Sequence, residues 1–163
     1  MSEREIRLFG DPVLKTVSDP VAAIDDRTRA LVQDLIDSVM LPGRAGVAAS
    51  QIGVNLRAFS YNVDGQLGYV INPVLVEVTG ELEEVGEGCL SVPDLWYPTP
   101  RYPFARVEGL DLDGNRIEVS GTGVLAQALQ HETDHLDGLL YLDRLSTENR
   151  RAAMRQIRES AWF

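Results

Sequence analysis

Apolar residues recur at two different periods along this chain, and each period predicts a different kind of element. After an extended N-terminal segment, the apolar residues return at the spacing of one helix face, as Leu31, Val32, Leu35, Ile36 and Val39. Asp25 or Asp26 can cap this predicted helix, and the helix should end before Pro42 and Gly43.

The middle of the chain is rich in residues that favour strands, in short runs bounded by turn residues. The predicted strands cover residues 56 to 63, 68 to 79, 82 to 92, 104 to 112 and 115 to 120. The dipeptide Asp-Gly occurs at 64 to 65 and again at 113 to 114, where it marks turns.

A helical pattern returns towards the C-terminus. The second helix should run from about residue 122 to 136, with Gly138 just beyond its end as a C-cap. A last helix should start near Ser146 or Thr147 and run almost to Phe163. The mix predicts an α+β fold, with mostly antiparallel strands packed around a central helix and with an N-terminal and a C-terminal helix.

Composition is typical of one globular domain spanning residues 1–163. Of the 163 residues, 44% are hydrophobic and 25% are charged, and no repeat or long linker divides them. A formal net charge of −10 argues against general binding of free nucleic acid or of an anionic membrane. No signal peptide or membrane-spanning apolar run is visible, and the single cysteine, Cys89, cannot form an internal disulfide. We therefore expect a cytoplasmic protein.

Both histidines of the chain lie in the segment "LQHETDHLDG", residues 129 to 138. The H-E-x-x-H spacing places His131 and His135 one turn apart on one helix face, where both imidazoles can bind one divalent ion. Glu132 then lies beside that ion, where it could transfer a proton. The pair could also be partly buried histidines of an amphipathic helix. Because the chain has no other histidine, we favour the metal site.

A metal bound by two histidines needs another protein ligand, because catalytic sites of this kind usually have three. In one group of zinc proteases the third ligand is a histidine six residues after the second, but this chain has Tyr141 there. A downstream glutamate, Glu148 or Glu159, would make the chain a zinc endopeptidase. Cys89 is the remaining candidate, although a lone cysteine is most often a small buried apolar residue.

Three short motifs occur in order along the chain: "GVAASQIG" at 46 to 53, "EGCLS" at 87 to 91 and "QHETDHLDG" at 130 to 138. Together they resemble the three motifs of bacterial peptide deformylases. The resemblance extends to the N-terminal segment "IRLFGDPVLKTVSDPV" and to "VEGLDLDGNRIEVSGTG" before the histidines, so it covers nearly the whole chain.

The resemblance implies a metal-dependent hydrolase that removes the formyl group from the N-formylmethionine of nascent polypeptides and releases formate. The implied metal ligands are Cys89, His131 and His135, with Glu132 as the proton carrier. The implied ion is Fe(II) in the cell, with Zn(II), Ni(II) or Co(II) able to occupy the same ligands.

Further residues follow from the same motifs. The implied donors to the developing oxyanion are the side-chain amide of Gln51 and the backbone N–H of Leu90. The substrate backbone would lie like an added strand along Ala45, Gly46 and Val47 and near Gly88.

Val124 and Ala128 share the helix face of the two histidines. The methionine side chain of the substrate would therefore enter beside them. For these two residues, plain core packing is an equally good interpretation.

The chain departs from the family pattern at a few positions. Arg44 stands where the first motif usually has a glycine, so the loop either takes another course or directs the arginine to solvent beside the substrate. "LWY" at 95 to 97 stands where some relatives carry a basic residue, and this apolar trio could contact the substrate or cover the core. Arg101 could pair with Glu87 behind the metal site or lie in solvent.

Two hypotheses concern the chain as a whole. Arg151, Arg155 and Arg158 would line one face of the last helix, either as a solvated face or as a surface that approaches the ribosome, in a way similar to some deformylases. The chain could also be an inactive, deformylase-like metal-binding module. The presence of Glu132 and Gln51 argues against that, because a purely structural site needs neither.

Overall fold

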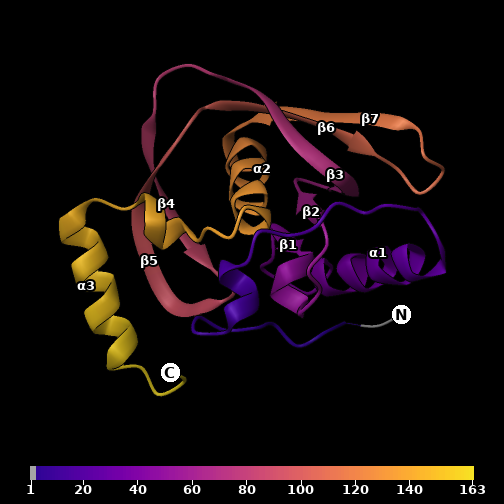
Figure 1. Cartoon of the computed structure of the whole chain (residues 1–163). Coiled ribbons are helices and arrows are strands. Elements are labelled where there is room, and N and C mark those ends of the chain that lie inside the picture. The colour runs from indigo at the N-terminus through magenta and orange to yellow at the C-terminus, as the bar shows by residue number, and fades with distance from the viewer. Residues whose placement is uncertain (1–2) are drawn as a thin grey trace.

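The computed structural model describes residues 3–163 and has an α+β fold, as the sequence predicts. The helices are α1 (Asp26–Val39), α2 (Gly123–Leu136) and α3 (Thr147–Arg158), with short 3-10 helices η1 (Pro12–Lys15), η2 (Ala49–Ile52) and η3 (Tyr141–Arg144). The strands are β1 (Gly46–Ala48), β2 (Ala58–Val63), β3 (Gln66–Thr79), β4 (Glu83–Cys89), β5 (Val92–Arg101), β6 (Phe104–Leu110) and β7 (Arg116–Thr122). Figure 1 shows α2 in the middle of the molecule, with α1 and α3 on opposite sides of it.

Within the described residues, the strands form a five-stranded antiparallel sheet in the order β1-β2-β3-β6-β7 and a separate hairpin of β4 and β5. The predicted turn at 64 to 65 joins β2 to β3, and Asp64 and Gly65 both have positive φ, as a tight hairpin requires. The predicted turn at 113 to 114 joins β6 to β7. Among the described residues, no helix has both the length and the apolar character needed to cross a bilayer.

The hairpin of β4 and β5 corrects the predicted strand at 82 to 92. That strand ends at Cys89, and the chain turns and returns as β5, which the sequence analysis did not predict. The sequence analysis missed β5 because this segment contains Pro93, Pro98 and Pro100. Proline lacks a backbone N–H and usually argues against a strand. In a two-stranded sheet each strand has an open edge, so these prolines need not interrupt the pairing with β4.

Helix α1 begins where the sequence predicts, because the Asp25 carboxylate accepts a hydrogen bond from the Thr28 backbone N–H at 3.1 Å. Leu31, Leu35 and Val39 of α1 pack against one face of the sheet. The helix is also tied to β2, where the Ser60 hydroxyl donates to the Leu35 carbonyl at 2.8 Å.

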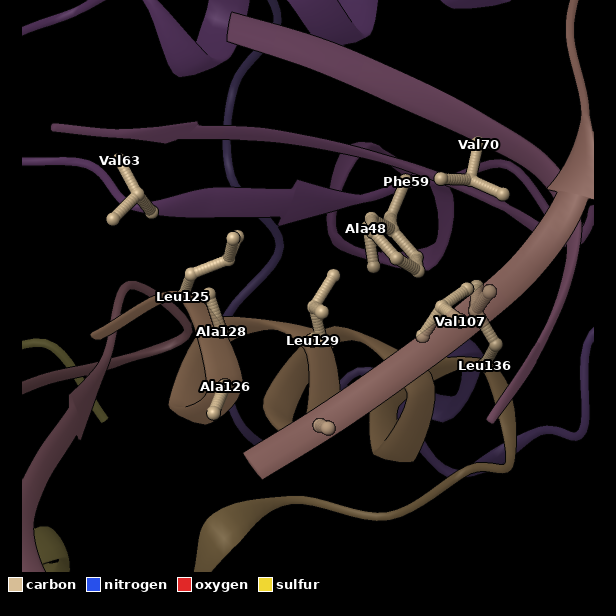
Figure 2. Close-up of a cluster of buried hydrophobic side chains, with 11 residues drawn as sticks. Ala48, Phe59, Val63, Val70, Val107, Leu125, Ala126, Ala128, Leu129 and Leu136 are labelled. Carbon is tan, nitrogen blue, oxygen red and sulfur yellow. The ribbon is translucent and has the colours of Figure 1, made fainter. Parts of the chain in front are cut away.

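Helix α2 packs against the face of β2 that α1 does not cover. Both faces of the strand can be covered because neighbouring residues of a strand point to opposite sides. Its apolar side chains meet those of the sheet in the main core, where Leu125 and Leu129 point towards the strands that carry Phe59 and Val70 (Figure 2). Gly138 follows the helix with a φ of 77°, which confirms the predicted C-terminal stop. Since α2 is enclosed on several sides, polar side chains on it become buried and need partners from other elements.

Helix α3 starts at Thr147, where the Ser146 hydroxyl accepts from the Asn149 backbone N–H at 3.2 Å, as the sequence predicts. It ends at Arg158 and not near Phe163, so the predicted length is wrong. Just past this end, the Ser160 hydroxyl donates to the Gln156 carbonyl at 2.8 Å and satisfies one of the last carbonyls of the helix. Buried residues of α3 pack on β5 and η3 in a second core.

Candidate metal centre and active site

Cys89, His131 and His135 meet at one point of the fold. Cys89 is the last residue of β4, where an irregular register lies between Glu87 and Cys89, and the histidines are on α2. The Cys89 Sγ lies 3.4 Å from His135 Nε2, and His135 Nε2 lies 3.2 Å from His131 Nε2. One candidate ligand atom from each of the three residues lies within 4.8 Å of the others.

These separations fit a divalent ion. Tetrahedral bonds of about 2.0–2.1 Å to nitrogen and about 2.3 Å to sulfur place two imidazole nitrogens about 3.3 Å apart and sulfur and nitrogen about 3.5 Å apart. The observed 3.2 Å and 3.4 Å agree with that geometry. Three protein ligands leave a fourth position for water or substrate, which is the pattern of a catalytic metal site.

The alternative ligands of a zinc endopeptidase lie elsewhere. Within residues 3–163, the cluster of possible metal ligands contains neither Glu148 nor Glu159, which lie at the start of α3 and just past its end. Tyr141 is buried, with its ring 6.5 Å from that of His131, and burial raises the pKa of its phenol, so it stays neutral. The structure therefore does not favour the endopeptidase hypothesis.

Glu87 fixes the orientation of His131. Its Oε2 accepts a hydrogen bond from His131 Nδ1 at 2.7 Å, so that Nε2 of the same ring is left to face the other two candidate ligands. Burial favours a raised pKa for Glu87, but hydrogen bonds from Arg101 and His131 outweigh it and lower the pKa to about 2. The Glu87 carboxylate is therefore ionised at neutral pH and keeps a proton on Nδ1 of the imidazole.

Arg101 pairs with Glu87, the first of the two alternatives that the sequence left open. Its guanidinium donates to both carboxylate oxygens of Glu87, at 2.9 Å and 2.6 Å, and to Asp134 Oδ2 at 2.7 Å. Arg144 donates to the same Asp134 at 2.8 Å and 3.2 Å. Arg101 is only 3% exposed, so this network of alternating charges lies largely in the interior behind the candidate ligands.

Glu132 lies beside the histidines with an unused carboxylate oxygen. The residue is 3% exposed, and among the described residues its Oε1 has no hydrogen-bond partner. Burial raises the pKa of the Glu132 carboxyl to about 7, so the group can take up and release a proton near neutral pH. A Cβ on Gly46 would come within 2.6 Å of Glu132 Oε2, so β1 can approach this carboxylate only because residue 46 is glycine.

Gln51 is buried and points towards Cys89, although without the family resemblance it would pass for an ordinary polar loop residue. Its Oε1 accepts from the Ala48 backbone N–H at 3.0 Å, which fixes the orientation of the amide. The Nε2 atom donates to Ser91 Oγ at 3.2 Å and lies 3.7 Å from Cys89 Sγ. Leu90 lies in the turn between β4 and β5, at the wall of the same cavity.

A cavity of about 510 Å³ opens beside these residues. Of the residues that the sequence analysis proposed for substrate binding, the following line it: Ala45, Gly46, Gly88, Val124 and Ala128. Val47 does not, because its side chain is fully buried against α1, so only its backbone could take part. Strand β1 is at the edge of the sheet, as an added substrate strand would require.

The structure adds one residue that sequence reasoning missed. Gln127 lines the cavity, and its Nε2 donates to the Gly86 carbonyl at 2.9 Å and to Glu87 Oε1 at 3.2 Å. Its position four residues before His131 on the same helix face was the available signal. Arg44, which the sequence analysis had named as a departure from the family pattern, lines the same cavity, and its guanidinium donates to the Ser38 carbonyl of α1 at 2.9 Å.

A one-Cys, two-His cluster with an adjacent buried glutamate and a free position defines the class of metal-dependent hydrolases. Comparison with known proteins identifies the family. The sequence model of the polypeptide deformylase family matches residues 3–151, so the chain belongs to this family. A peptide deformylase from Parafrankia sp. is 49% identical over 163 residues, covering 99% of this chain and 89% of the relative. Peptide deformylase 1 of Corynebacterium glutamicum is 46% identical and is covered over 99% of its length.

Solved structures agree. The crystal structure of a peptide deformylase from Legionella pneumophila superposes with a TM-score of 0.90 at 35% identity, covering 97% of this chain and 95% of that one. The peptide deformylase from Ehrlichia chaffeensis in complex with actinonin gives a TM-score of 0.89 at 32% identity, with both chains fully covered. Both relatives support the α+β arrangement around α2.

Proposed function

We propose that residues 1–163 act as one catalytic domain that removes the formyl group from N-formylmethionyl peptides. Water is added across the amide, the bond between the formyl carbon and the methionine nitrogen breaks, and formate and a free amine are released. The observation that carries this proposal is the cluster of Cys89, His131 and His135 beside Glu132, whose Oε1 has no hydrogen-bond partner among the described residues, at the wall of a cavity.

Cys89, His131 and His135 would hold one divalent ion, with the cysteine as a thiolate. When bound there, the ion supplies a hydroxide nucleophile near neutral pH and polarises the carbonyl of the substrate. We propose Fe(II) as the ion in the cell, with Zn(II), Ni(II) or Co(II) able to take its place, since availability often decides which metal occupies such ligands.

Glu132 would accept the proton of the attacking water and pass it to the departing amine. Burial raises the pKa of the Glu132 carboxyl, and this supports the role because it makes the group readier to take up a proton than an exposed glutamate. The unpartnered Oε1 supports it as well, because that atom is available to a water or to the substrate nitrogen.

Gln51 and Leu90 would stabilise the negative charge that develops on the carbonyl oxygen, through the Gln51 amide and the Leu90 backbone N–H. The hydrogen bond from Ala48 to Gln51 supports this, because donors that are fixed in advance need no rearrangement during the reaction.

The substrate would bind as an extended strand along Ala45, Gly46 and the backbone of Val47, with Gly88 on its other side. Methionine would enter beside Val124 and Ala128. Val124 is 53% exposed, which supports a role in lining the pocket over core packing, whereas Ala128 is buried.

Formate release tests this function. Protein purified without oxygen and loaded with Fe(II) should release formate from formyl-Met-Ala-Ser and should leave acetyl-Met-Ala-Ser intact, because a tight site around the carbonyl carbon excludes the extra methyl group. Equal hydrolysis of both peptides, or cleavage of internal peptide bonds without formate release, would contradict the proposal and favour an endopeptidase.

Because its substrates are nascent chains, we propose that the protein acts in the cytoplasm and approaches the ribosome through α3. Arg151, Arg155 and Arg158 are exposed on this helix although the chain as a whole is acidic, and ribosomal RNA would attract them in a salt-dependent way. Reversing the three charges should reduce co-sedimentation with ribosomes at low salt, while reversing Arg106 on β6 should not. Unchanged co-sedimentation of the triple variant would leave α3 as a solvated face.

A further inference from the structure

Trp96 on β5 is the most exposed of the large hydrophobic side chains in the described part of the chain, at 71%. It is also part of the wall of the active-site cavity. A single exposed apolar residue on a surface needs no explanation, but one at the mouth of a catalytic cavity is placed where a substrate passes. Its exposure also rules out the idea that Trp96 covers the core.

Two glycines seat the indole on β4. A Cβ at Gly88 would lie 3.0 Å from Trp96 Cε3, and a Cβ at Gly86 would collide with Trp96 Nε1. The ring therefore lies against the backbone of β4, which leaves its other side open. Glycine at both positions allows this contact, and the same Gly88 lines the cavity.

The neighbours of Trp96 hold it in this position. Leu95 is 5% exposed and packs in the core beneath α3. The Tyr97 hydroxyl donates to Gln156 Oε1 on α3 at 2.9 Å. Because the backbone on both sides is anchored, the indole is a preformed surface that loses little conformational freedom when something binds to it.

The distance of the Trp96 indole from Cys89 matches the distance of the second or third residue of a bound peptide from its formyl group. Gly88 and Gly86 come one and three residues before Cys89, which is about 3 to 10 Å along a strand with a rise of about 3.3 Å per residue. An extended peptide with its formyl group at the metal ligands would have its second and third residues at similar distances. We infer that Trp96 is a specificity-determining residue, which binds an apolar or aromatic side chain at the second or third position of the peptide.

This inference rests on the proposed function and adds to it a preference among nascent chains. Contact between an aromatic side chain of the substrate and the indole should favour phenylalanine over serine by about fivefold in kcat/KM at one of the two positions. The preference should appear mainly in KM, because the contact is made before and during the reaction alike.

The test compares formyl-Met-Xaa-Ser and formyl-Met-Ala-Xaa, with phenylalanine or serine as Xaa. For Trp96→Ala the ratio of kcat/KM between the two peptides should fall to about one, and Trp96→Phe should restore most of it. Phe163→Ala is the matched control, since Phe163 is 60% exposed and packs on Phe9, and it should keep the wild-type ratio. A Trp162→Phe variant leaves Trp96 as the single indole, whose fluorescence should change when the product Met-Phe-Ser or Met-Ala-Phe is added.

A wild-type ratio near one, or an unchanged ratio in Trp96→Ala, would overturn the inference. An equal loss towards all peptides with the ratio preserved would also overturn it, because Trp96 would then have only a structural role. If the wild-type protein releases no formate from any of these peptides, the proposed function is wrong. If, in addition, the fluorescence of Trp96 does not change when either product is added, the inferred binding role of Trp96 is wrong as well.

Discussion

Replacing Arg101 with methionine should destabilise the protein strongly and weaken metal binding as well. The guanidinium is 3% exposed and makes three hydrogen bonds to the carboxylates of Glu87 and Asp134. Methionine replaces the apolar stem of the arginine and ends where Nε lies, so the substitution removes the guanidinium group with its positive charge and its hydrogen bonds. Two buried carboxylates then lose a partner whose charge compensated theirs.

The size of the loss in stability depends on which hydrogen bonds each carboxylate keeps after the substitution. Asp134 keeps two hydrogen bonds from Arg144, so its loss is partly compensated. Among the described residues, Glu87 keeps the bond to His131 Nδ1 and the bond from the neutral amide of Gln127 at 3.2 Å. Removing one partner of a buried ion pair typically costs about 3–5 kcal/mol, and we expect a loss in that range. Because Glu87 would also orient His131 less firmly, metal affinity should fall by about 10- to 100-fold.

Urea unfolding in the presence of a chelator measures the first effect, because the chelator removes the contribution of metal binding to stability. Competition with a chromophoric chelator then measures zinc affinity. Arg106→Met is the matched control: Arg106 also contacts three carboxylates, those of Glu77, Glu108 and Glu118, but at the surface, so its loss should be too small to resolve. A loss below about 1 kcal/mol for Arg101→Met, indistinguishable from the control, would refute this reasoning.

Other substitutions test the site directly. Cys89→Ala should abolish bound metal and formate release together, and full metal content in this variant would show that Cys89 is not a ligand. Glu132→Gln should keep the metal but lower kcat by about 10²- to 10⁴-fold, with KM little changed; near-wild-type turnover at verified metal content would exclude it as the proton carrier. Gly46→Ala would place a Cβ within 2.6 Å of Glu132 Oε2, so the carboxylate must move. A misplacement of about 1 Å in a catalytic group can cost about 10²-fold in rate, so we expect a loss of turnover of that order. A thermal melt that stays unchanged would locate the effect in the site.

Several elements could be predicted because their signals are local. Asp25, the apolar spacing of α1 and the Asp-Gly turn at 64 to 65 all act through residues a few positions away, and the structure has these elements where they were expected. Strand β5 was missed for the opposite reason. Its prolines oppose a strand locally, and only pairing with β4 makes residues 92 to 101 extended.

The same distinction runs through the candidate site. The sequence by itself determined that His131 and His135 lie on one face of a helix, because residues four apart are always neighbours there. Only the tertiary structure decided that Cys89, which comes 46 residues before His135, lies 3.4 Å from it, and that Arg101 is buried against Glu87. These contacts depend on how β4, β5 and α2 pack together. The spacing of apolar residues along the chain does not show which strand will lie beside which helix. Buried charges such as Arg101 are especially hard to predict, because an isolated arginine prefers water and becomes stable in the interior only when the fold supplies its partners.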